Sequence, residues 1–369
     1  MDLPTRIIML VDLDYFYAQC EELRNPSLKT KPVVVCVYSG RSEDSGAVST
    51  ANYVARNYGV KSGMPIFLAK KKLENVEAVF LPVDFQFYEE MSAKVMGILR
   101  NFADEFEQVG IDEAYLDVTR RSLGDFGKAE ELAKMMKNDL LLQQKLTCSV
   151  GVGPNKLVAK IASDEKKPDG LTVIRPEQAS SFLEPLLVSR LIGVGTKTFE
   201  KMLGMGIKKI GDLARHDVQK LIAVFGRILG TYFHNASIGI DNEPVKEKGE
   251  AESISRMATL KLDTRDLSIT LEKTAELSND LHQRMLTDKS AFQTVSIIAI
   301  TTDLGTHTRS KTLDKPSTDV TLIDRTVREL LEKFLSESDL EIRRVGVKLS
   351  NFSGVGKNQK QITSYFQTT

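Results

Sequence analysis

The sequence predicts a multidomain α+β protein, and three observations support this class. The chain has 369 residues, too many for one compact core, so two to four domains are expected. Segments of strand and helix type alternate as far as Gly170, and a helical stretch broken by glycines follows. After a short charged segment, strands and helices alternate again. We therefore expect two mixed regions separated by a helical one.

Composition is that of an ordinary water-soluble protein, with 41% hydrophobic and 27% charged residues. No apolar run reaches the length of a membrane span, and the N-terminus lacks the pattern of a signal peptide. Three scattered cysteines, Cys20, Cys36 and Cys148, favour a reducing cytoplasm and no zinc site. The formal net charge is zero, so any binding of nucleic acid must depend on local basic surfaces.

The first elements are a strand, a short helix and a second strand. Residues 1–12 contain the apolar run "RIIML" and are typical of a strand, and residues 14–24 of a helix that stops before Pro26. The run "KPVVVCVY", residues 31–38, has the β-branched composition of a buried strand, and a polar, Gly-containing loop follows it.

A second helix and a pair of strands come next. In "STANYVARNYGV", Ser49 or Thr50 is placed to cap a helix that Gly59 ends. The stretch "EFEQVGIDEAYLDVT", which begins at Glu105, indicates two strands that meet at a tight Gly-Ile-Asp-Glu turn.

The first region closes with a strand and a helix. "KLTCSVGVG", from Lys145, is the strand, and "PNKLVAKIASDEKK" is a helix with Pro154 at its first position. Residues 175–241 are predicted as short helices. Residues 242–252, charged and poor in apolar side chains, are predicted as a linker.

The last region is predicted as a small α+β domain. Its strands are "SISRMATLKL", "QTVSIIAITTDL" and "EIRRVGVKLSNF", and two amphipathic helices lie between them. From Ser353 the chain is polar and contains glycine until "QITSYF".

Acidic residues at two strand ends are the first candidates for a functional site. In "VDLDYFYAQC" Asp12 ends a strand, and Asp112 and Glu113 lie at a strand turn a hundred residues later. Three neighbouring carboxylates repel one another unless a cation joins them. Two divalent ions about 3.5–4 Å apart would remove that repulsion and serve an in-line displacement at phosphorus, for which Mg²⁺ is suited. Asp14 alternates away from Asp12 on an extended strand and is not predicted as a ligand.

The acidic motifs have two other interpretations, and a glycine-rich segment suggests a third kind of site. Either acidic motif alone is consistent with ordinary surface acids at strand ends. A strand that ends in Asp-x-Asp also occurs in aspartate-nucleophile phosphatases of the haloacid dehalogenase type. That family usually continues with Gly and Thr, whereas Tyr15 and Phe16 stand here. The glycines of "SVGVGPNK" suggest a phosphate loop, but the Gly-Lys-Ser/Thr ending of a Walker A motif is missing.

Three further residues indicate a receptor for phosphate. Tyr53 and Arg56 are three apart and share one helical face. A guanidinium and a phenol hydroxyl that point together bind phosphate oxygens. Lys167 directly precedes a proline, which places it at a turn.

These pieces, in this order, resemble the Y-family DNA polymerases, of the DinB or polymerase IV branch that copies damaged templates. The stretches that carry the resemblance are jointly very specific and cover nearly the whole chain: "VDLDYFYAQCEELRNPSLKTKPVVV", "SGAVSTANYVARNYGVKSGMP", "IDEAYLDVT", "SVGVGPNKLVAKIASDEKKPDG" and "IRRVGVKLSNF". The resemblance implies a right-hand architecture with an added α+β little-finger domain. Its expected parts are the palm (1–15 and 83–173), the fingers (16–82), the thumb (174–241), a linker (242–252), the little finger (253–351) and a flexible tail (352–369).

The resemblance also implies roles for single residues. Asp12, Asp112 and Glu113 fall on the catalytic metal-binding acids, and the carbonyl of Leu13 falls on a further metal ligand. Tyr17 falls on the steric gate, an aromatic ring beneath the sugar that leaves no room for a 2′-OH. The residues that fall on the triphosphate-binding positions are Tyr53, Arg56 and Lys167.

The sequence departs from many relatives at two positions. Val54 stands where they have Glu, and it should face away from Tyr53 and Arg56 with little effect. Gly110 stands where they have Ser before the acidic turn, which is expected to loosen the turn or to remove a contact to DNA.

Two further regions are candidates for binding DNA. "LIGVGTKTFEKMLGMGIKKIGDLA" predicts a helix-hairpin-helix that binds a DNA phosphate through backbone N–H groups, without reading bases. The alternative is an ordinary Gly-rich turn. The residues that favour the DNA-binding hairpin are Gly193, Gly195, Lys197, Lys201, Lys208 and Lys209. In the last domain the basic residues that would follow the DNA backbone, the alternative being a solvated sheet face, are Arg256, Arg343, Arg344 and Lys348.

The tail "QKQITSYF" resembles the peptide that archaeal and eukaryotic sliding clamps (PCNA) bind. Its anchor positions are Gln359, Ile362, Tyr365 and Phe366. Exposed aromatic residues on a tail are costly without a partner, although a frayed terminus is the alternative. Because bacterial clamps prefer a different peptide, the tail indicates an archaeal source.

Together these features predict an error-prone translesion DNA polymerase without proofreading. It would add deoxynucleotides to a primer 3′-OH by two-metal phosphoryl transfer with two Mg²⁺ ions. The expected partners are primer-template DNA, deoxynucleoside triphosphates and a sliding clamp, for a cytoplasmic monomer. A catalytically idle clamp partner with the same fold is the second hypothesis, which the intact acid triad disfavours. The phosphatase hypothesis leaves the hairpin and the tail unexplained.

Overall fold

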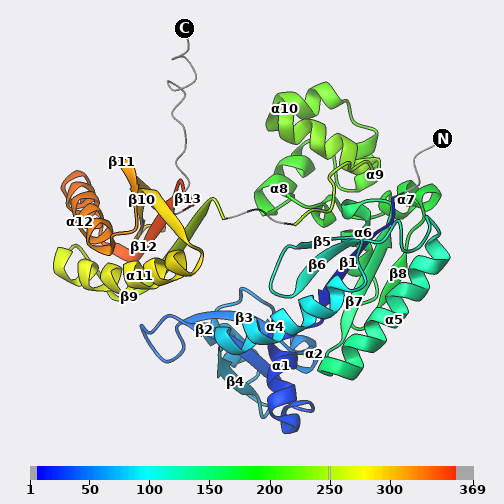
Figure 1. The fold of residues 1–369 in the computed structure, drawn as a ribbon, viewed down its shortest axis with the longest axis horizontal. Helices are drawn as coiled ribbons and strands as arrows, with labels where there is room; N and C mark the ends of the chain where they lie inside the picture. Colours follow the sequence, from blue (N-terminus) through cyan, green and yellow to red (C-terminus); the bar gives the residue numbers. More distant parts are fainter. Residues whose placement is uncertain (1–5, 248, 250, 355–369) are drawn as a thin grey trace. The chain divides into compact units, whose positions relative to one another are not determined.

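The structure is a computed structural model that describes residues 6–247, 249 and 251–354 (Figure 1). The chain divides into two compact units. The first comprises residues 1–36, 48–63 and 71–248, and the second comprises residues 37–47, 64–70 and 249–369. Within the described ranges no helix is long and apolar enough to span a bilayer.

A five-stranded sheet forms the centre of the first unit. Its order is β5 (Glu105–Gln108), β6 (Glu113–Asp117), β1 (Ile8–Leu13), β7 (Cys148–Gly153) and β8 (Leu171–Val173). The central strand β1 is antiparallel to both neighbours, β6 and β7. The strands predicted at the N-terminus, around the acidic turn and at "KLTCSVGVG" are confirmed.

Helices cover one face of this sheet. Met9, Val11 and Leu13 alternate to that face and pack in the core with α1 (Phe16–Arg24), α4 (Phe85–Arg100) and α5 (Phe126–Gln144) (Figure 1). The helix predicted over residues 14–24 is confirmed within two residues at its start. The long helices α4 and α5 were not predicted individually.

The opposite face of the sheet carries Ile8, Leu10 and Asp12 and is covered by α6 (Lys156–Ser163). A Cβ at Gly151 would lie 2.0 Å from the carbonyl oxygen of Ala159, so only glycine allows α6 to approach this closely. The prediction that Pro154 occupies the first helical position is wrong. Asn155 caps the helix, because its side chain accepts a hydrogen bond from the backbone N–H of Val158 at 3.0 Å.

The segment 243–247, predicted as part of a linker, packs on the same face of the sheet. Val245 is only 5% exposed and contacts the cluster of Ile8 and Leu10. Charged contacts hold both ends of the segment: Lys156 to Glu243 (3.5 Å), Arg6 to the Glu243 carbonyl (2.7 Å) and Arg100 to Glu247 (2.6 Å). The linker prediction is wrong for these residues. It relied on their low apolar content, whereas a single valine is enough to anchor the segment. We refer to residues 243–247 as the strap.

A three-stranded sheet lies beside α1 and is built from β3 (Gly46–Ala51), β2 (Val33–Tyr38) and β4 (Val79–Pro82), with α2 (Tyr53–Asn57) and α3 (Ile66–Lys72). Ser49 and Thr50 do not cap α2, because both lie in β3. The cap is Asn52, whose side chain accepts from the N–H of Ala55 at 3.0 Å.

Residues 174–241 form the predicted helical region. Its helices are α7 (Pro176–Leu183), α8 (Thr196–Gly204), α9 (Ile210–Ala214) and α10 (Val218–Ser237), and a 3₁₀ turn spans Val188–Arg190. They enclose an apolar core around Met202, Leu221 and Phe233, which the outer side of α6 joins. Gly226, with φ of 81°, interrupts α10.

Most of the second unit is a four-stranded antiparallel sheet with two helices. The strand order is β11 (Thr306–Ser317), β10 (Ser290–Thr301), β12 (Ile342–Ser350) and β9 (Ser253–Thr264), and β13 (Ser353–Gly354) pairs with β10. The helices α11 (Leu267–Thr287) and α12 (Val320–Glu337) pack on one face. The three predicted strands and two helices are confirmed. β11 was missed because this edge strand is almost entirely polar.

Candidate active site

The fold brings the three predicted acids to one edge of the central sheet. Asp12 is directly opposite Glu113 in the register of β1 and β6, so both side chains project from the same face. Asp112 precedes β6, and its carbonyl accepts a hydrogen bond from the N–H of Leu13 at 2.9 Å. Burial, together with the charges of Asp12 and Glu113, raises the pKa of Asp112. The acids therefore form a site with excess negative charge.

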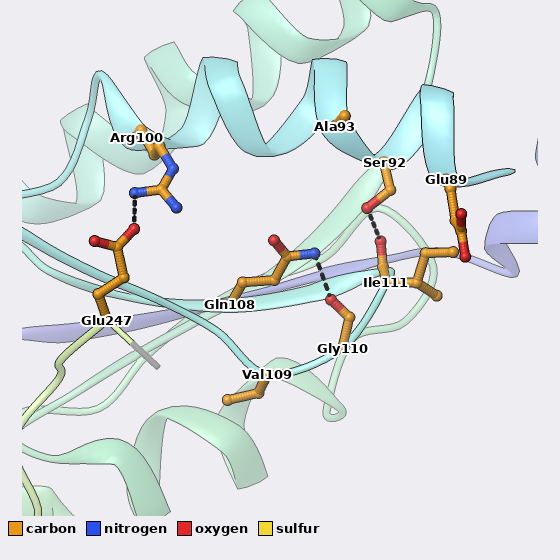
Figure 2. A pocket seen from close by; sticks show the side chains of 9 residues that line it. All are labelled: Glu89, Ser92, Ala93, Arg100, Gln108, Val109, Gly110, Ile111 and Glu247. Atoms are coloured by element: carbon orange, nitrogen blue, oxygen red, sulfur yellow. Dashed lines mark hydrogen bonds and ion pairs between the residues drawn. The ribbon is translucent and has the colours of Figure 1, made fainter. Parts of the chain in front are cut away.

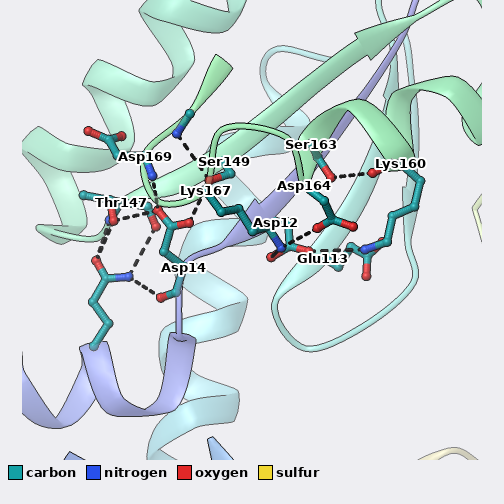
Figure 3. A network of polar contacts seen from close by, with 12 residues as sticks. Asp12, Asp14, Glu113, Thr147, Ser149, Lys160, Ser163, Asp164, Lys167 and Asp169 are labelled. Atoms are coloured by element: carbon teal, nitrogen blue, oxygen red, sulfur yellow. Dashed lines mark hydrogen bonds and ion pairs between the residues drawn. The ribbon is translucent and has the colours of Figure 1, made fainter. Parts of the chain in front are cut away.

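Two lysine amines form ion pairs with Asp12 and Glu113 (Figure 3). Lys160 Nζ lies 2.8 Å from Glu113 Oε1 and 3.2 Å from Asp12 Oδ2. Lys167 Nζ lies 2.7 Å from Asp12 Oδ1 and 3.0 Å from Asp164 Oδ1. Burial lowers the pKa of each lysine, but the adjacent carboxylates outweigh burial and the net pKa of both is raised.

Lys160 was not predicted as a site residue. It lies four residues after Lys156, one turn further along α6, and reaches the acids because α6 packs directly on Gly151. The two glycines of "SVGVG" followed by two lysines at helical spacing were the available signal. Without the tertiary packing, however, the signal does not show which acids the lysines meet.

Asp14 has a different role from Asp12. It is 1% exposed and accepts hydrogen bonds from Ser149 Oγ (2.7 Å), Thr147 Oγ1 (2.9 Å) and the N–H of Asp169 (2.8 Å) (Figure 3). These bonds fix the turn that follows Lys167. Asp14 thus positions the turn that carries the lysine.

A cavity of about 410 Å³ adjoins the acids and contains the predicted nucleotide-binding residues. Arg56 Nε donates to the carbonyl of Ala51 at 2.8 Å, and its guanidinium lies 4.9 Å from the centre of the Tyr53 ring. The structure thus brings together residues that are far apart in the sequence. The predicted residues that line the cavity are Asp12, Leu13, Tyr17, Tyr53, Arg56, Asp112 and Lys167.

Aromatic rings form one wall of this cavity. Tyr17 stacks on Tyr88 with ring centres 4.2 Å apart and planes at 12°. The Tyr88 hydroxyl donates to Glu21 at 2.8 Å inside the core, so the stack has a fixed base. Tyr15, at the start of α1, adopts the left-handed conformation with φ of 35°, which is uncommon for a bulky residue and marks a strained turn beside the acids.

The turn that carries Asp112 is held by side chains from α4 and β5 (Figure 2). Gln108 Nε2 donates to the carbonyl of Gly110 at 2.9 Å, and Ser92 Oγ donates to the carbonyl of Ile111. A Cβ at position 110 would lie 3.2 Å from Asp112 Oδ1, a tight contact. Glycine therefore leaves room for the Asp112 side chain, and the two hydrogen bonds keep the turn ordered. This region also lines a separate cavity of about 610 Å³.

The residues fit divalent cations by their donor chemistry, because hard carboxylate oxygens from two adjacent strand ends face one cavity. Across the described residues, no three Asp, Glu, His or Cys side chains converge closely enough to hold a metal ion as they stand. The amine of Lys160 lies between Asp12 and Glu113, and the amine of Lys167 lies between Asp12 and Asp164.

In the predicted DNA-binding hairpin, the 3₁₀ turn at Val188–Arg190 stands where the first helix was expected, and α8 follows the Gly-Val-Gly turn. Gly193 has φ of 84°, and Gly195 is the N-cap of α8. Lys197 is exposed at the start of that helix. Lys201 donates to the carbonyl of Val224 at 3.1 Å. The backbone N–H groups of Lys208 and Lys209 both donate to Asp212, at 3.2 and 2.8 Å.

The predicted basic residues of the second unit divide between the two faces of its sheet. Arg256 opposes Val347 on the helix-covered face and pairs with Asp280 of α11. Arg343 lies 3.6 Å from Asp263. Arg344 and Lys348 alternate to the other face, where Lys348 has Ser296 and Ser255 as cross-strand neighbours.

The predicted clamp-binding residues, Gln359, Ile362, Tyr365 and Phe366, lie outside the described residues.

Comparisons with known proteins show the family to which the chain belongs. Residues 11–164 and 251–364 match the impB/mucB/samB family and its C-terminal domain, and residues 189–241 match the thumb domain described for DNA polymerase-iota. "DNA polymerase IV" of Nitrosopumilus maritimus is 49% identical over 99% of this chain and 100% of its own length. "DNA polymerase IV" of Saccharolobus solfataricus is 39% identical over 94% of this chain and 96% of its own.

Two solved structures show the same fold. A Y-family DNA polymerase chimera, Dbh-Dpo4(243-245)-Dbh, has a TM-score of 0.89 at 37% identity and covers 94% of this chain and 99% of its own. An insertion ternary complex of Dbh DNA polymerase has a TM-score of 0.68 at 36% identity, with the same coverage. These matches exclude the phosphatase hypothesis and confirm the predicted fold class.

Proposed function

The chain belongs to the Y family of DNA polymerases, as a translesion enzyme of the polymerase IV type, and on that premise we propose that it extends a primer by two-metal phosphoryl transfer with Mg²⁺. The observation that carries this proposal is the set of three carboxylates at one sheet edge, beside a cavity that contains a tyrosine, an arginine and a lysine. The ligands would be Asp12, Asp112, Glu113 and the carbonyl of Leu13.

The ions, when bound, would lower the pKa of the primer 3′-OH and neutralise charge on the phosphates. The chain's own groups bind and orient the incoming deoxynucleotide. Arg56 and Lys167 supply charge-assisted hydrogen bonds to phosphate oxygens, and Tyr53 adds a hydroxyl donor. Tyr17 closes the cavity beneath the sugar. Because its ring is stacked on Tyr88, it cannot move aside for a 2′-OH. We find no residues for a proofreading nuclease in the described part of the chain, and the proposal includes none.

Primer extension tests the metal-site assignment. Asp112→Ala should abolish single-nucleotide incorporation while DNA affinity, measured by fluorescence anisotropy, stays close to that of the unaltered enzyme. Glu105→Ala on β5 is the matched control, because this carboxylate is exposed and pairs only with Arg120 among the contacts of the described residues. Near-normal incorporation by the Asp112 variant would contradict the assignment.

Sugar selection tests the role of Tyr17 separately. Tyr17→Ala should retain deoxynucleotide incorporation and admit ribonucleotides far more readily, because the ring acts as a wall. Tyr53→Phe is the control, since it removes only the hydroxyl that is assigned to phosphate. An unchanged ratio of ribonucleotide to deoxynucleotide incorporation in the Tyr17 variant would refute this role.

DNA is held, on this proposal, by the hairpin at Gly193 and Gly195 and by the open sheet face with Arg344 and Lys348. Both contacts go to phosphates and carry no sequence preference, which suits a template-directed enzyme. Arg344→Glu should weaken DNA binding and reduce its dependence on salt, whereas Arg256→Glu should do less, because Arg256 pairs with Asp280.

The tail is proposed as the site for a sliding clamp, on the strength of its residue pattern. Deletion of residues 357–369 should leave unaided primer extension by the monomeric enzyme unchanged and abolish stimulation by archaeal PCNA. Tethering raises the effective concentration of the enzyme at the primer end. Replacement of Tyr365 and Phe366 by Ala should reproduce the deletion, because a few aromatic anchors usually dominate such an interface. Equal stimulation of all three proteins would place any clamp contact elsewhere.

A further inference from the structure

The two oxygens of Asp12 are both engaged by amines. Oδ2 lies 3.2 Å from Lys160 Nζ, and Oδ1 lies 2.7 Å from Lys167 Nζ. A divalent cation that binds Asp12 must therefore share these oxygens with the amines, and their positive charges oppose its binding. This competition lies within the side chains that are assigned to the metal, and displacement of an amine would relieve it.

The two lysines differ in what they keep after such an exchange. Lys167 has a second partner, Asp164, at 3.0 Å and outside the predicted ligand set. Both direct carboxylate partners of Lys160, Asp12 and Glu113, belong to the ligand set. If metal takes both acids, Lys160 loses its ion pairs with Asp12 and Glu113, whereas Lys167 retains its pair with Asp164 and stays beside the cavity.

Displacement of the Lys160 amine requires a movement of its side chain and not of helix α6. Its helix cannot move back and forth easily, because α6 is packed backbone to backbone on Gly151 and is capped by Asn155. The Lys160 side chain is 24% exposed, so the ammonium has a path to solvent.

We propose that Lys160 is a resident counter-ion of the acid site, which holds Asp12 and Glu113 together without metal and weakens divalent-cation binding until it is displaced. This inference rests on the proposed metal site and adds a positioning residue to it. A lysine that had only to support the fold would not need to pair with two metal ligands. Removal of the Lys160 charge should lower the stability of the metal-free protein and raise its affinity for a divalent cation. These two effects have opposite sign.

Mn²⁺ binding to the full-length protein, without DNA or nucleotide, provides the test by electron paramagnetic resonance. Lys160→Met keeps most of the length of the side chain and removes its charge. It should bind Mn²⁺ about tenfold more tightly, because one positive charge no longer opposes the cation. Thermal unfolding in EDTA should occur at a lower temperature than in the unaltered protein. Lys156→Met is the matched control, since it lies one turn away on α6 and pairs with Glu107, and should leave Mn²⁺ affinity unchanged. Unchanged or weaker Mn²⁺ binding by Lys160→Met would overturn the inference.

A measurement on the unaltered protein keeps the test decisive if the variant does not fold. Acylation of lysines by a succinimidyl ester, followed by mass spectrometry, should become faster at Lys160 when Mg²⁺ replaces EDTA and should not change at Lys156. Equal or slower labelling of Lys160 with Mg²⁺ contradicts displacement. Asp112→Ala separates the two proposals. If this variant binds Mn²⁺ like the unaltered protein, the metal site itself is wrong. If it loses Mn²⁺ while Lys160→Met has no effect, only the counter-ion role fails.

Discussion

Lys156 and Lys160, one turn apart on α6, meet acidic residues at two ends of the same sheet face. Lys156 Nζ lies 2.8 Å from Glu107 Oε2, and its side chain is 8% exposed. The strap covers this pair, and the backbone N–H of Lys246 donates to the same Glu107 oxygen at 3.3 Å. Lys160 pairs with Glu113 and Asp12 beside the cavity. One helix therefore places one lysine in a buried environment and another in an accessible one. We call the surroundings of Lys156 the sealed end and those of Lys160 the open end.

The difference between the two ends shows what separates a structural ion pair from a binding site. At the sealed end Lys156 has one buried partner, Glu107, a more exposed one, Glu243, and the Tyr115 ring with its centre 5.1 Å away. The ammonium is therefore paired and almost entirely shielded from water. At the open end Asp12, Glu113 and Asp164 share two amines, Asp112 adds a further carboxylate, and access from the cavity remains. A surplus of negative charge together with access is what allows a different cation to enter.

The largest effect should come from an acid at the open end. Glu113→Ala should reduce nucleotide incorporation by about a thousandfold or more, because it removes a proposed metal ligand. Its effect on the free energy of unfolding should be small, since it also relieves repulsion within the cluster. Single-turnover incorporation and urea unfolding of the same preparation measure both quantities. A large loss of stability with little loss of the incorporation rate would show that Glu113 acts as a structural residue, like the acid at the sealed end.

An acid at the sealed end should behave in the opposite way. Glu107→Ala leaves the Lys156 ammonium buried without its main partner, which should cost about 3–5 kcal/mol of stability. The incorporation rate per folded molecule should be retained, because Glu107 does not line the nucleotide cavity. Glu107→Ala combined with Lys156→Met should recover part of the stability. If the double variant is no more stable than the single one, the pair is not the cause.

The sequence predicted the open end far better than the sealed end. Asp12, Asp112 and Glu113 were found because acids at strand ends are chemically unusual, and the motifs around them resemble a known family. Val245 was assigned to a linker, because a single apolar residue among charges carries no periodic signal. Its burial depends on the packing of the whole sheet, which spacing along the chain cannot reveal.

Two local errors have the same origin. Ser49 and Thr50 suit both a helix cap and a strand, and the pairing of β3 with β2 decides for the strand. Lys160 is one of many lysines on helices, and only the close approach that Gly151 permits places it on the acids. In both cases tertiary contacts choose between alternatives that are equivalent at the level of sequence.

A smaller change in activity should follow from removing the other lysine of the open end. Lys167→Ala removes a charge-assisted hydrogen bond to the nucleotide and should raise its KM by about ten- to a hundredfold. Primer affinity should change little, because the hairpin and the sheet of the second unit hold DNA in the proposed complex. Steady-state kinetics with varied nucleotide, beside a DNA-binding titration, distinguishes the two. If only DNA affinity falls, Lys167 belongs to the DNA groove.

The smallest effect should come from substitutions in the strap. They test whether this segment is what shields the Lys156–Glu107 pair from water. Val245→Ala removes two methyl groups that pack against Ile8 and Leu10, which should cost about 1–2 kcal/mol of stability. Catalysis should not change, because the acids lie at the other end of β1. Val245→Asp should cost more stability, since a carboxylate would enter an apolar contact next to Glu107.

Hydrogen exchange of the backbone amide of Lys246 reports directly on the strap. Exchange should be faster in Val245→Ala, because the valine is the anchor that holds this amide on Glu107. If exchange at Lys246 stays slow in both variants, the charged contacts of Glu243 and Glu247 hold the strap without the valine, and the sealing of Lys156 is electrostatic in origin.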